Sequence, residues 1–289
     1  MPTRSLTPRL ANIRLHPIKA LDPVFVPQAR IGPKGGLELD RIWALYSSDG
    51  RWVNGKRTPA MHLIRAEYSP DLSAVTLSIP GDRRNIPAMT FAFPDDTDGA
   101  ALWFSTFFEQ NIVVHYAREG FPDDSAASGP TLVSRESLET VCTWFPGMPL
   151  DEARRRFRTT LEVAGGASSD GDGPRNTGEA DPLGEKLPPF WEDRLFGGDE
   201  TQVVRFRIGE VGFEGSNPCA RCPVPSRDSR SGEVVEGFQK RFSELRQAQL
   251  PAWAPAGRFD HFYRLATNTR VPSTEQGKLL RVGDEVRVG

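Results

Sequence analysis

The sequence predicts a β-rich α+β protein in which hairpins build a barrel and a few helices pack at its periphery. Most of the chain consists of short β-type runs separated by turn residues such as Gly, Pro, Asp and Ser. Only a few segments show helical spacing of apolar residues. The 289 residues, 38% of them hydrophobic, are enough to bury one large core or two ordinary ones.

The first 120 residues read mostly as strands. Asp49 and Gly50 separate the runs RIWALYS and RWVNG, and Asp-Gly between two β-type runs is a strong hairpin signal. The runs HLIRAEY and AVTLSIP predict a second hairpin, followed by strands at MTFAF and NIVVHY. Between these last two, AALWFSTFFEQ predicts a short helix that buries Leu102 and Phe107.

A polar, Gly- and Pro-bearing stretch at residues 120–130 predicts a domain boundary. We therefore predict a first domain over residues 1–125 and a second over residues 126–289. Within the second, residues 165–187 are dominated by Gly, Ser, Asp and Pro. They cannot bury enough apolar surface to offset the loss of conformational entropy on ordering. They predict a flexible surface insertion.

Helices and hairpins alternate in the second half. Ser134 and Asp151 are predicted as N-caps of two helices. Phe238, Phe242 and Leu245 are spaced as the buried face of a third. Hairpins are predicted for QVVRFRI with EVGFEG, and for KLLRV with EVRVG at the C-terminus.

Composition excludes several classes of protein. A formal net charge of -2 gives no bulk attraction to nucleic acid. No apolar run approaches the roughly 20 residues of a membrane span, and the N-terminus has no secretory apolar region. Three cysteines cannot build a disulfide framework and indicate a reducing compartment. We predict a cytoplasmic protein; a mitochondrial location stays open, since a presequence removed earlier would leave no trace.

The sharpest local motif is a single CxxC, formed by Cys219 and Cys222 between two prolines. On spacing alone it is compatible with a zinc site that recruits Cys142 and one of the four histidines, with a thiol–disulfide pair, or with two buried structural cysteines. A fourth reading is a soft metal held by one thiolate. Arg221 stands beside Cys222 and would favour its thiolate form.

Four cationic residues stand at predicted strand ends or turns: Lys19, Arg41, Arg57 and Arg158. Singly, each is typical of a solvated surface charge. Together they predict an anion pocket, because the guanidinium fork can give a phosphate two parallel hydrogen bonds.

Several segments, taken in order, resemble the MOSC family (molybdenum cofactor sulfurase C-terminal domain). HPIKA and the run GLELDRIWALYSSDGRWVNGKRTPAMHLI resemble its N-terminal β-barrel domain. SGPTLVSRESL, RFRTTLEV, FWEDRLF, CARC and RVGDEVRV follow in the order of the MOSC domain, over nearly the whole chain. The resemblance implies a MOSC-type β-barrel preceded by a β-barrel-like N-terminal domain.

The resemblance also implies a cofactor and a set of residues that hold it. Family members, among them the mitochondrial amidoxime-reducing component, carry a pyranopterin molybdenum cofactor. The second cysteine of the C-x-R-C loop ligates the metal there, which makes Cys222 the expected metal ligand and catalytic residue. The residues expected to contact the cofactor are Lys19, Arg41, Ser128, Arg158, Ala220 and Arg221, and Arg57 is expected to orient the substrate.

The sequence departs from the family pattern near these contacts. Ala20 and Ala127 stand where hydroxyl residues are common, and Thr159 and Thr160 replace a Pro-Asn pair after Arg158. These changes bear on substrate identity and cofactor affinity more than on fold.

Three functional hypotheses follow. The first is a molybdenum-dependent oxidoreductase that reduces N-hydroxylated small molecules such as amidoximes or hydroxylamines, with electrons from a separate reductase, ferredoxin or cytochrome. The second is a cofactor-binding or sulfur-carrier protein without turnover of its own. The third is a MOSC-like scaffold that has lost the cofactor. Turnover of an N-hydroxylated compound discriminates the first from the other two.

Overall fold

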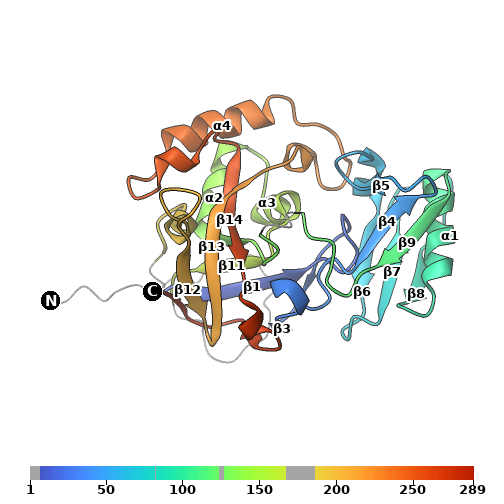
Figure 1. Cartoon of the computed structure of the whole chain (residues 1–289). Coiled ribbons are helices and arrows are strands. Elements are labelled where there is room, and N and C mark those ends of the chain that lie inside the picture. The colour runs from blue at the N-terminus through green and yellow to red at the C-terminus, as the bar shows by residue number, and fades with distance from the viewer. Residues whose placement is uncertain (1–6, 82, 124–126, 167–185) are drawn as a thin grey trace.

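The computed structural model describes residues 7–81, 83–123, 127–166 and 186–289. Its larger part is built on an eight-stranded sheet, and its smaller part on two three-stranded sheets with one helix against them (Figure 1). The insertion predicted over residues 165–187 lies, apart from its ends, outside the described residues. The predicted β-rich α+β class is confirmed.

The eight-stranded sheet collects strands from both ends of the chain. Its order is β16 (Val286–Val288), β12 (Val204–Ile208), β13 (Val211–Ala220), β14 (Arg264–Arg270), β10 (Leu132–Ser134), β11 (Leu161–Ala164), β1 (Arg9–Leu15) and β2 (Val24–Phe25). Neighbours pair antiparallel, except for the parallel pair β10 and β11. The predicted hairpin of β12 and β13 is confirmed.

This sheet curls toward a barrel. The start of β1 reaches the residues before β16, where Arg9 and Glu285 form an isolated antiparallel bridge. The Leu10 amide donates to the carbonyl of Asp284 over 2.8 Å, and the Gly283 amide donates to the carbonyl of Leu10 over 2.7 Å. Within the described residues, however, no continuous ladder closes the sheet into a barrel.

The predicted C-terminal hairpin is wrong. Strand β15 (Leu279–Arg281) pairs with β3 (Gln28–Arg30), and β16 pairs with β12. The two C-terminal strands therefore separate after the turn at Gly283, because each finds a longer-range partner. Strands β1 and β3, from the predicted first domain, pair with strands of the predicted second domain. The boundary at residue 125 stays a prediction.

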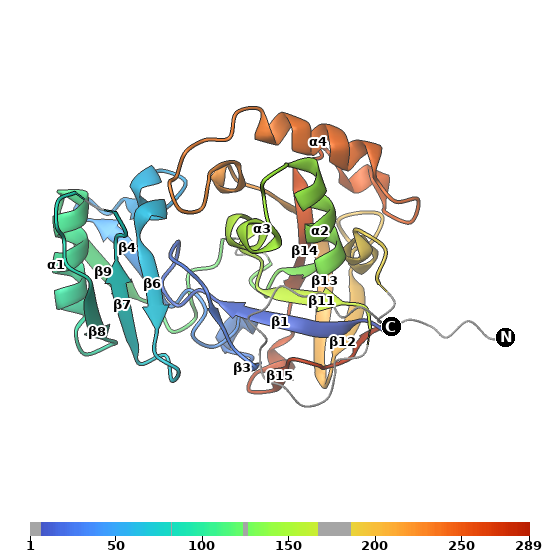
Figure 2. The ribbon, with the colours of Figure 1, turned by 180° about the vertical axis from the view of Figure 1, so that it is seen from behind.

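Three helices cover one face of the large sheet. They are α2 (Arg135–Trp144), α3 (Leu150–Phe157) and α4 (Phe238–Ala248), and Figure 2 shows α2 and α3 in front of the strands, with α4 along the top. Phe238 and Phe242 of α4 are buried in the core that these helices share, as predicted, and Leu245 is partly buried there.

The two predicted N-caps differ in outcome. Ser134 caps α2, and its hydroxyl accepts from the amide of Ser137. Asp151 is not a cap: α3 begins at Leu150, and Pro149 occupies the cap position. An extended Pro149 sets the chain into the helix two residues early, which leaves Asp151 in the first turn, where its charge still suits the helix dipole.

The smaller part holds the two hairpins predicted near the N-terminus, both confirmed. One three-stranded sheet comprises β5 (Trp52–Val53), β4 (Trp43–Ser47) and β9 (Ile112–Tyr116), and the other β6 (Arg65–Tyr68), β7 (Ala74–Ser78) and β8 (Met89–Ala92). Helix α1 (Thr97–Phe108) buries Phe107, but the expectation for Leu102 is wrong, since 70% of Leu102 is exposed. Trp103, Phe104 and Phe107 form the buried face, and Leu102 lies off it.

Short 3-10 turns join these elements. They are η1 (Pro33–Gly35), η2 (Pro59–Leu63), η3 (Trp191–Leu195), η4 (Val224–Ser226), η5 (Ala256–Arg258) and η6 (Ser273–Glu275).

Candidate functional site

Arg158 stands at the junction of α3 and β11. It ends the helix in the left-handed conformation, with φ 51°, and its amide donates to the carbonyl of Arg154. Such a conformation is uncommon for a residue other than glycine and marks a position that the surrounding structure imposes. The guanidinium of Arg158 has no hydrogen bond or ion pair with any residue that the structure describes. Burial, and then the charge of Arg41, lower the pKa of Arg158 to about 10.

Lys19 follows β1 at the start of a turn. Its amide donates to the carbonyl of Trp43, which fixes the turn against β4. Its Nζ atom donates to the carbonyl of Phe121 over 2.8 Å and lies 2.8 Å from a carboxylate oxygen of Asp123. The same Nζ lies 4.8 Å from the centroid of the Trp52 ring, a cation–π distance. Only 15% of the Lys19 side chain is exposed.

Arg41 is held on the other side of Asp123. It too is left-handed, with φ 53°, and its amide donates to the carbonyl of His16. Its guanidinium is paired with the neighbouring Asp40, and its Nε lies 3.8 Å from Asp123. His16 is buried beside this pair, and burial, followed by the charge of Arg158, lowers the pKa of His16 to about 3.

The cysteine motif lies at the end of β13. Ala220 is the last residue of the strand, Cys219 is half-buried and Cys222 is exposed. The sequence predicts that Arg221 faces Cys222 and favours its thiolate form. In the structure the guanidinium of Arg221 contacts two other residues instead. Its Nη1 atom donates to Cys219 Sγ over 3.1 Å, and its Nη2 atom donates to the carbonyl of Phe157. The thiol of Cys222 forms no hydrogen bond with the described residues.

These contacts bring the three regions together. Arg221 ties the cysteine loop to Phe157, the residue before Arg158. Arg158 is within electrostatic range of Arg41, and Arg41 is within range of Cys219. The structure therefore gathers Lys19, Arg41 and Arg158 next to the cysteine loop.

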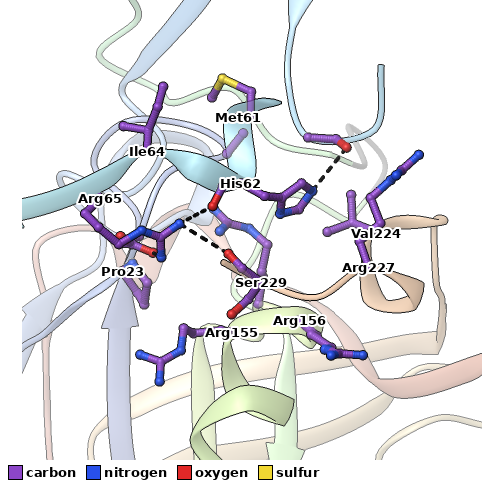
Figure 3. Close-up of a pocket in the computed structure, with 14 residues that line it drawn as sticks. Pro23, Met61, His62, Ile64, Arg65, Arg155, Arg156, Val224, Arg227 and Ser229 are labelled. Carbon is purple, nitrogen blue, oxygen red and sulfur yellow. Dashed lines mark hydrogen bonds and ion pairs between the residues drawn. The ribbon is translucent and has the colours of Figure 1, made fainter. Parts of the chain in front are cut away.

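A pocket opens beside these cations, which we call the central pocket. Figure 3 shows it between the smaller part of the molecule, which contributes Met61 and His62, and the α3 and η4 region, which contributes Arg156 and Val224. Arg158 also lines it. His62 is held by the carbonyl of Gly55, 3.3 Å from its Nε2 atom, and burial lowers the pKa of His62. The pocket is thus bordered by several positive charges and a neutral imidazole.

Two other predicted site residues lie apart from this group. Ser128 donates its hydroxyl to the carbonyl of Lys34 over 2.6 Å, so it braces the η1 turn. Arg57 is exposed in the turn after Asn54 and does not line the central pocket. Their assigned roles stay predictions.

Thr159 and Thr160, where the sequence departs from the family, are both fully buried. Neither hydroxyl has a hydrogen-bond partner in the described part of the chain. A buried polar atom without a partner is costly. These two hydroxyls follow Arg158 directly in the sequence, so three polar side chains without a partner among the described residues stand in a row at this junction.

The structure bears on the alternatives for the CxxC motif. All three cysteines are free thiols, so Cys219 and Cys222 are not joined. Across residues 7–81, 83–123, 127–166 and 186–289, no group of three or more His, Cys, Asp or Glu side chains is placed to hold a metal ion. A zinc site built by protein ligands alone is therefore not supported there.

Some residues of the site could not be assigned from sequence. The sequence places Asp123 in a polar joint, and nothing local signals that it pairs with Lys19. His62 and Arg65 lie in the run HLIRAEY, which predicts only a strand, and the fold places both at the central pocket.

Comparison with known proteins decides the family. The sequence matches the MOSC N-terminal beta barrel domain over residues 7–111 and the MOSC domain over residues 187–287. The chain belongs to the MOSC family. Lys19 and Arg41 of this MOSC protein lie within the first match and Cys222 within the second, whereas Arg158 lies between the two.

Three relatives of this MOSC protein have curated names. Molybdenum cofactor sulfurase of Drosophila willistoni is 22% identical over 273 residues, which cover 86% of this chain and 30% of that protein. Mitochondrial amidoxime reducing component 2 of Bos taurus is 26% identical over 142 residues, 39% of this chain and 42% of that protein. Mitochondrial amidoxime-reducing component 1 of Xenopus laevis is 24% identical over 119 residues, 35% of each chain. The chain spans less than half the length of each relative.

One further finding concerns membranes. In the described residues, no helix combines the length and the apolar character that crossing a bilayer requires.

Proposed function

We propose that this MOSC protein binds the molybdenum cofactor and reduces N-hydroxylated small molecules such as amidoximes or hydroxylamines. The observation that carries the proposal is the gathering of Lys19, Arg41 and Arg158 beside a loop that presents the exposed thiol of Cys222. Among the described residues, the guanidinium of Arg158 has no hydrogen-bond or ion-pair partner. Two of the relatives are amidoxime reducing components by name, which supports the choice of substrate class.

The residues present fit a cofactor that carries both a phosphate and a soft metal. A phosphate needs cations with free donors, and Arg158 has a half-buried guanidinium with none of its donors engaged by described residues. A soft metal prefers thiolate, and Cys222 is the exposed thiol of the loop. The orphan hydroxyls of Thr159 and Thr160 add two unsatisfied polar atoms at the same junction.

In this assignment the chain's own residues bind and orient. Lys19, Arg41 and Arg158 would hold the phosphate, Cys222 would ligate the metal, and the backbone at Ala220 and Arg221 would shape the loop. When bound, the cofactor supplies the two-electron chemistry that removes oxygen from an N–O group. His62, at the central pocket, is neutral near pH 7. Its Nε2 atom faces the carbonyl of Gly55 and carries the ring proton, so its Nδ1 atom can accept one hydrogen bond from a substrate without adding charge.

Arg221 and Phe157 give this site its rigidity. The Arg221 guanidinium joins the end of β13, through Cys219, to the end of α3, through Phe157, and so would hold the cysteine loop against the junction at Arg158. A site held from two elements keeps its geometry better than one carried on a free loop.

Electrons would come from a separate reductase, ferredoxin or cytochrome, and the site would act in the cytoplasm or in mitochondria.

The test is turnover. Protein produced in a host that makes the cofactor is assayed for reduction of benzamidoxime to benzamidine with reduced methyl viologen as electron source. We expect turnover by the wild type and by Cys142→Ala, and loss of at least about 100-fold in Cys222→Ala, since the metal ligand itself is removed. Wild-type protein that is loaded with cofactor but does not turn over would rule out this activity.

A second candidate function has one specific observation behind it. Molybdenum cofactor sulfurase matches 86% of this chain, more than either amidoxime reducing component does. A carrier of the cofactor would need the same thiol and cations but no turnover. Loaded protein that fails the benzamidoxime assay, yet transfers its cofactor to an apo-acceptor enzyme, would favour this candidate.

A further inference from the structure

A second cleft lies beside the central pocket, and we call it the outer cleft. The two share Asp22, Pro23, Arg65 and Arg155, so they are neighbours around the same rim. The outer cleft has a volume of about 220 Å³, against about 50 Å³ for the central pocket. It therefore offers more room for a small ligand.

The outer cleft is lined by an excess of positive charge. Asp22 and Asp151 are its acidic residues, and each is already paired with one arginine, Arg65 or Arg154. The arginines that line it are Arg14, Arg65, Arg154, Arg155 and Arg230.

Arg14 places unmatched charge at the base of the cleft. Its side chain is buried, and its Nη2 atom is paired with Glu162, while its Nε and Nη1 atoms have no partner in the described structure. The carboxylate of Glu162 is shared with Arg135 and Arg154, at 3.2 Å and 2.7 Å. One buried carboxylate thus serves three guanidiniums, and a buried charge without full compensation favours an incoming anion.

Arg155 and Arg230 lie at the mouth of the outer cleft, and the N–H donors of their guanidiniums are largely unused by the described residues. Arg230 is exposed, and its guanidinium forms no hydrogen bond or ion pair with the described residues. Arg155 lies 3.9 Å from Glu152, whose carboxylate is already bonded to Arg156 and to Ser229. Figure 3 shows the Arg155 guanidinium on the side of Pro23 and Arg65, while Arg156 points the other way. Arg155 and Arg230 can therefore each donate guanidinium hydrogen bonds to a ligand.

Phe25 supplies an apolar wall. It lines the outer cleft and is 37% exposed. The guanidinium carbon of Arg14 lies over its ring, 5.3 Å from the ring centroid. A ligand whose anionic end meets the arginines can lay an apolar or aromatic part against this ring.

We propose that the outer cleft binds a small phosphate monoester, with its phosphate between Arg155 and Arg230 above Arg14 and its organic part against Phe25. The charge excess favours a dianion over a monoanion, and a tetrahedral phosphate accepts the parallel hydrogen bonds of more than one guanidinium fork. This site requires neither the cofactor nor turnover, so its test stands apart from that of the proposed function.

The test is isothermal titration calorimetry at low ionic strength with three probes of matched ring: phenyl phosphate, benzoate and phenol. We expect saturable binding of one phenyl phosphate, binding of benzoate about tenfold weaker, and no heat from phenol. Benzoate binding as tightly as phenyl phosphate would assign the cleft to carboxylates and overturn the proposal, as would the absence of saturable phosphate binding.

Variants locate the bound phosphate. Arg155→Ala and Arg230→Ala should each weaken phenyl phosphate binding about tenfold, the usual worth of a charge-assisted hydrogen bond. Arg205→Ala removes the same charge from an exposed position on β12 outside the cleft and should change binding less than about twofold. Binding that survives Arg230→Ala and Arg155→Ala but is lost in Lys19→Ala would place the phosphate elsewhere and contradict the proposal.

Discussion

The guanidinium of Arg221 donates to the Sγ atom of Cys219, 3.1 Å away, and to the carbonyl oxygen of Phe157. The arginine of the CxxC motif thus forms its hydrogen bonds with the first cysteine and with the end of α3, and forms none with the second cysteine. In consequence, Cys222 keeps its thiol free at the surface of the loop.

Arg221→Ala should destabilise the fold by about 1–3 kcal/mol, because the Phe157 carbonyl loses a charge-assisted partner. Urea unfolding measures the loss. Arg205→Ala, an exposed arginine on β12, is the matched control and should change the free energy of unfolding by less than about 0.5 kcal/mol. Equal stability of Arg221→Ala and wild type would mean that this bridge does not hold the loop.

Asp123 occupies the cations that the proposal assigns to the phosphate. Its carboxylate lies 2.8 Å from Lys19 and 3.8 Å from Arg41, although 72% of its side chain is exposed. A phosphate must therefore displace it, and Asp123→Asn, which keeps the shape and removes the charge, should raise the affinity for cofactor several-fold, about 1 kcal/mol. Cofactor retained after dialysis at graded salt is the measurement. Retention lowered by Asp123→Asn would show that Asp123 supports the site instead.

We expect the buried His16 to lower the free energy of unfolding as the pH falls below neutral. Burial holds its folded pKa at about 3, below the ordinary 6.5, so the unfolded chain takes up a proton below pH 6.5 while the folded chain does not. Stability is therefore lost as pH drops from 6.5 toward 3. Between pH 7 and pH 5 the loss from this residue is about 2 kcal/mol.

The comparison with His16→Gln isolates this contribution. The variant lacks the titrating ring, so the difference in free energy of unfolding between it and the wild type should change with pH over that range. Parallel stability curves for the two proteins from pH 7 to pH 5 would contradict the assignment.

Glu162 should be costly to neutralise. It is fully buried on β11 and pairs with Arg14, Arg135 and Arg154, so Glu162→Gln removes the one carboxylate charge that these three guanidiniums share. We expect a loss of about 3–5 kcal/mol in the free energy of unfolding. Glu244→Gln, whose partner Lys240 lies 4.0 Å away at the surface, should cost less than about 0.5 kcal/mol. A stable Glu162→Gln would mean that the cluster is not charge-balanced by this residue.

Much of the fold could be predicted because the deciding signals are local. Turn residues such as Asp49 and Gly50 mark hairpins directly, and Ser134 is a cap whose hydroxyl serves the next turn. The C-terminal pairing could not be predicted in the same way. Strand β15 pairs with β3, almost the length of the chain away, and nothing near Leu280 signals that partner.

The candidate site likewise contains residues that local motifs predict and residues that only the fold brings together. Lys19, Arg41 and Cys222 stand in recognisable motifs, and the structure brings the regions that hold them together. Ser128 shares a motif too, yet its hydroxyl is used by the η1 turn. Asp123 and Arg155 carry no motif, because their roles depend on which charges the fold places beside them.

The most direct test of the central claim is metal analysis of protein produced in a host that makes the molybdenum cofactor, run beside Cys222→Ala and, as control, Cys142→Ala. We predict near-stoichiometric molybdenum and pterin in the wild type and in Cys142→Ala, and loss of molybdenum in Cys222→Ala. Well-folded wild-type protein without molybdenum would contradict the account and leave a MOSC scaffold whose thiols serve another purpose.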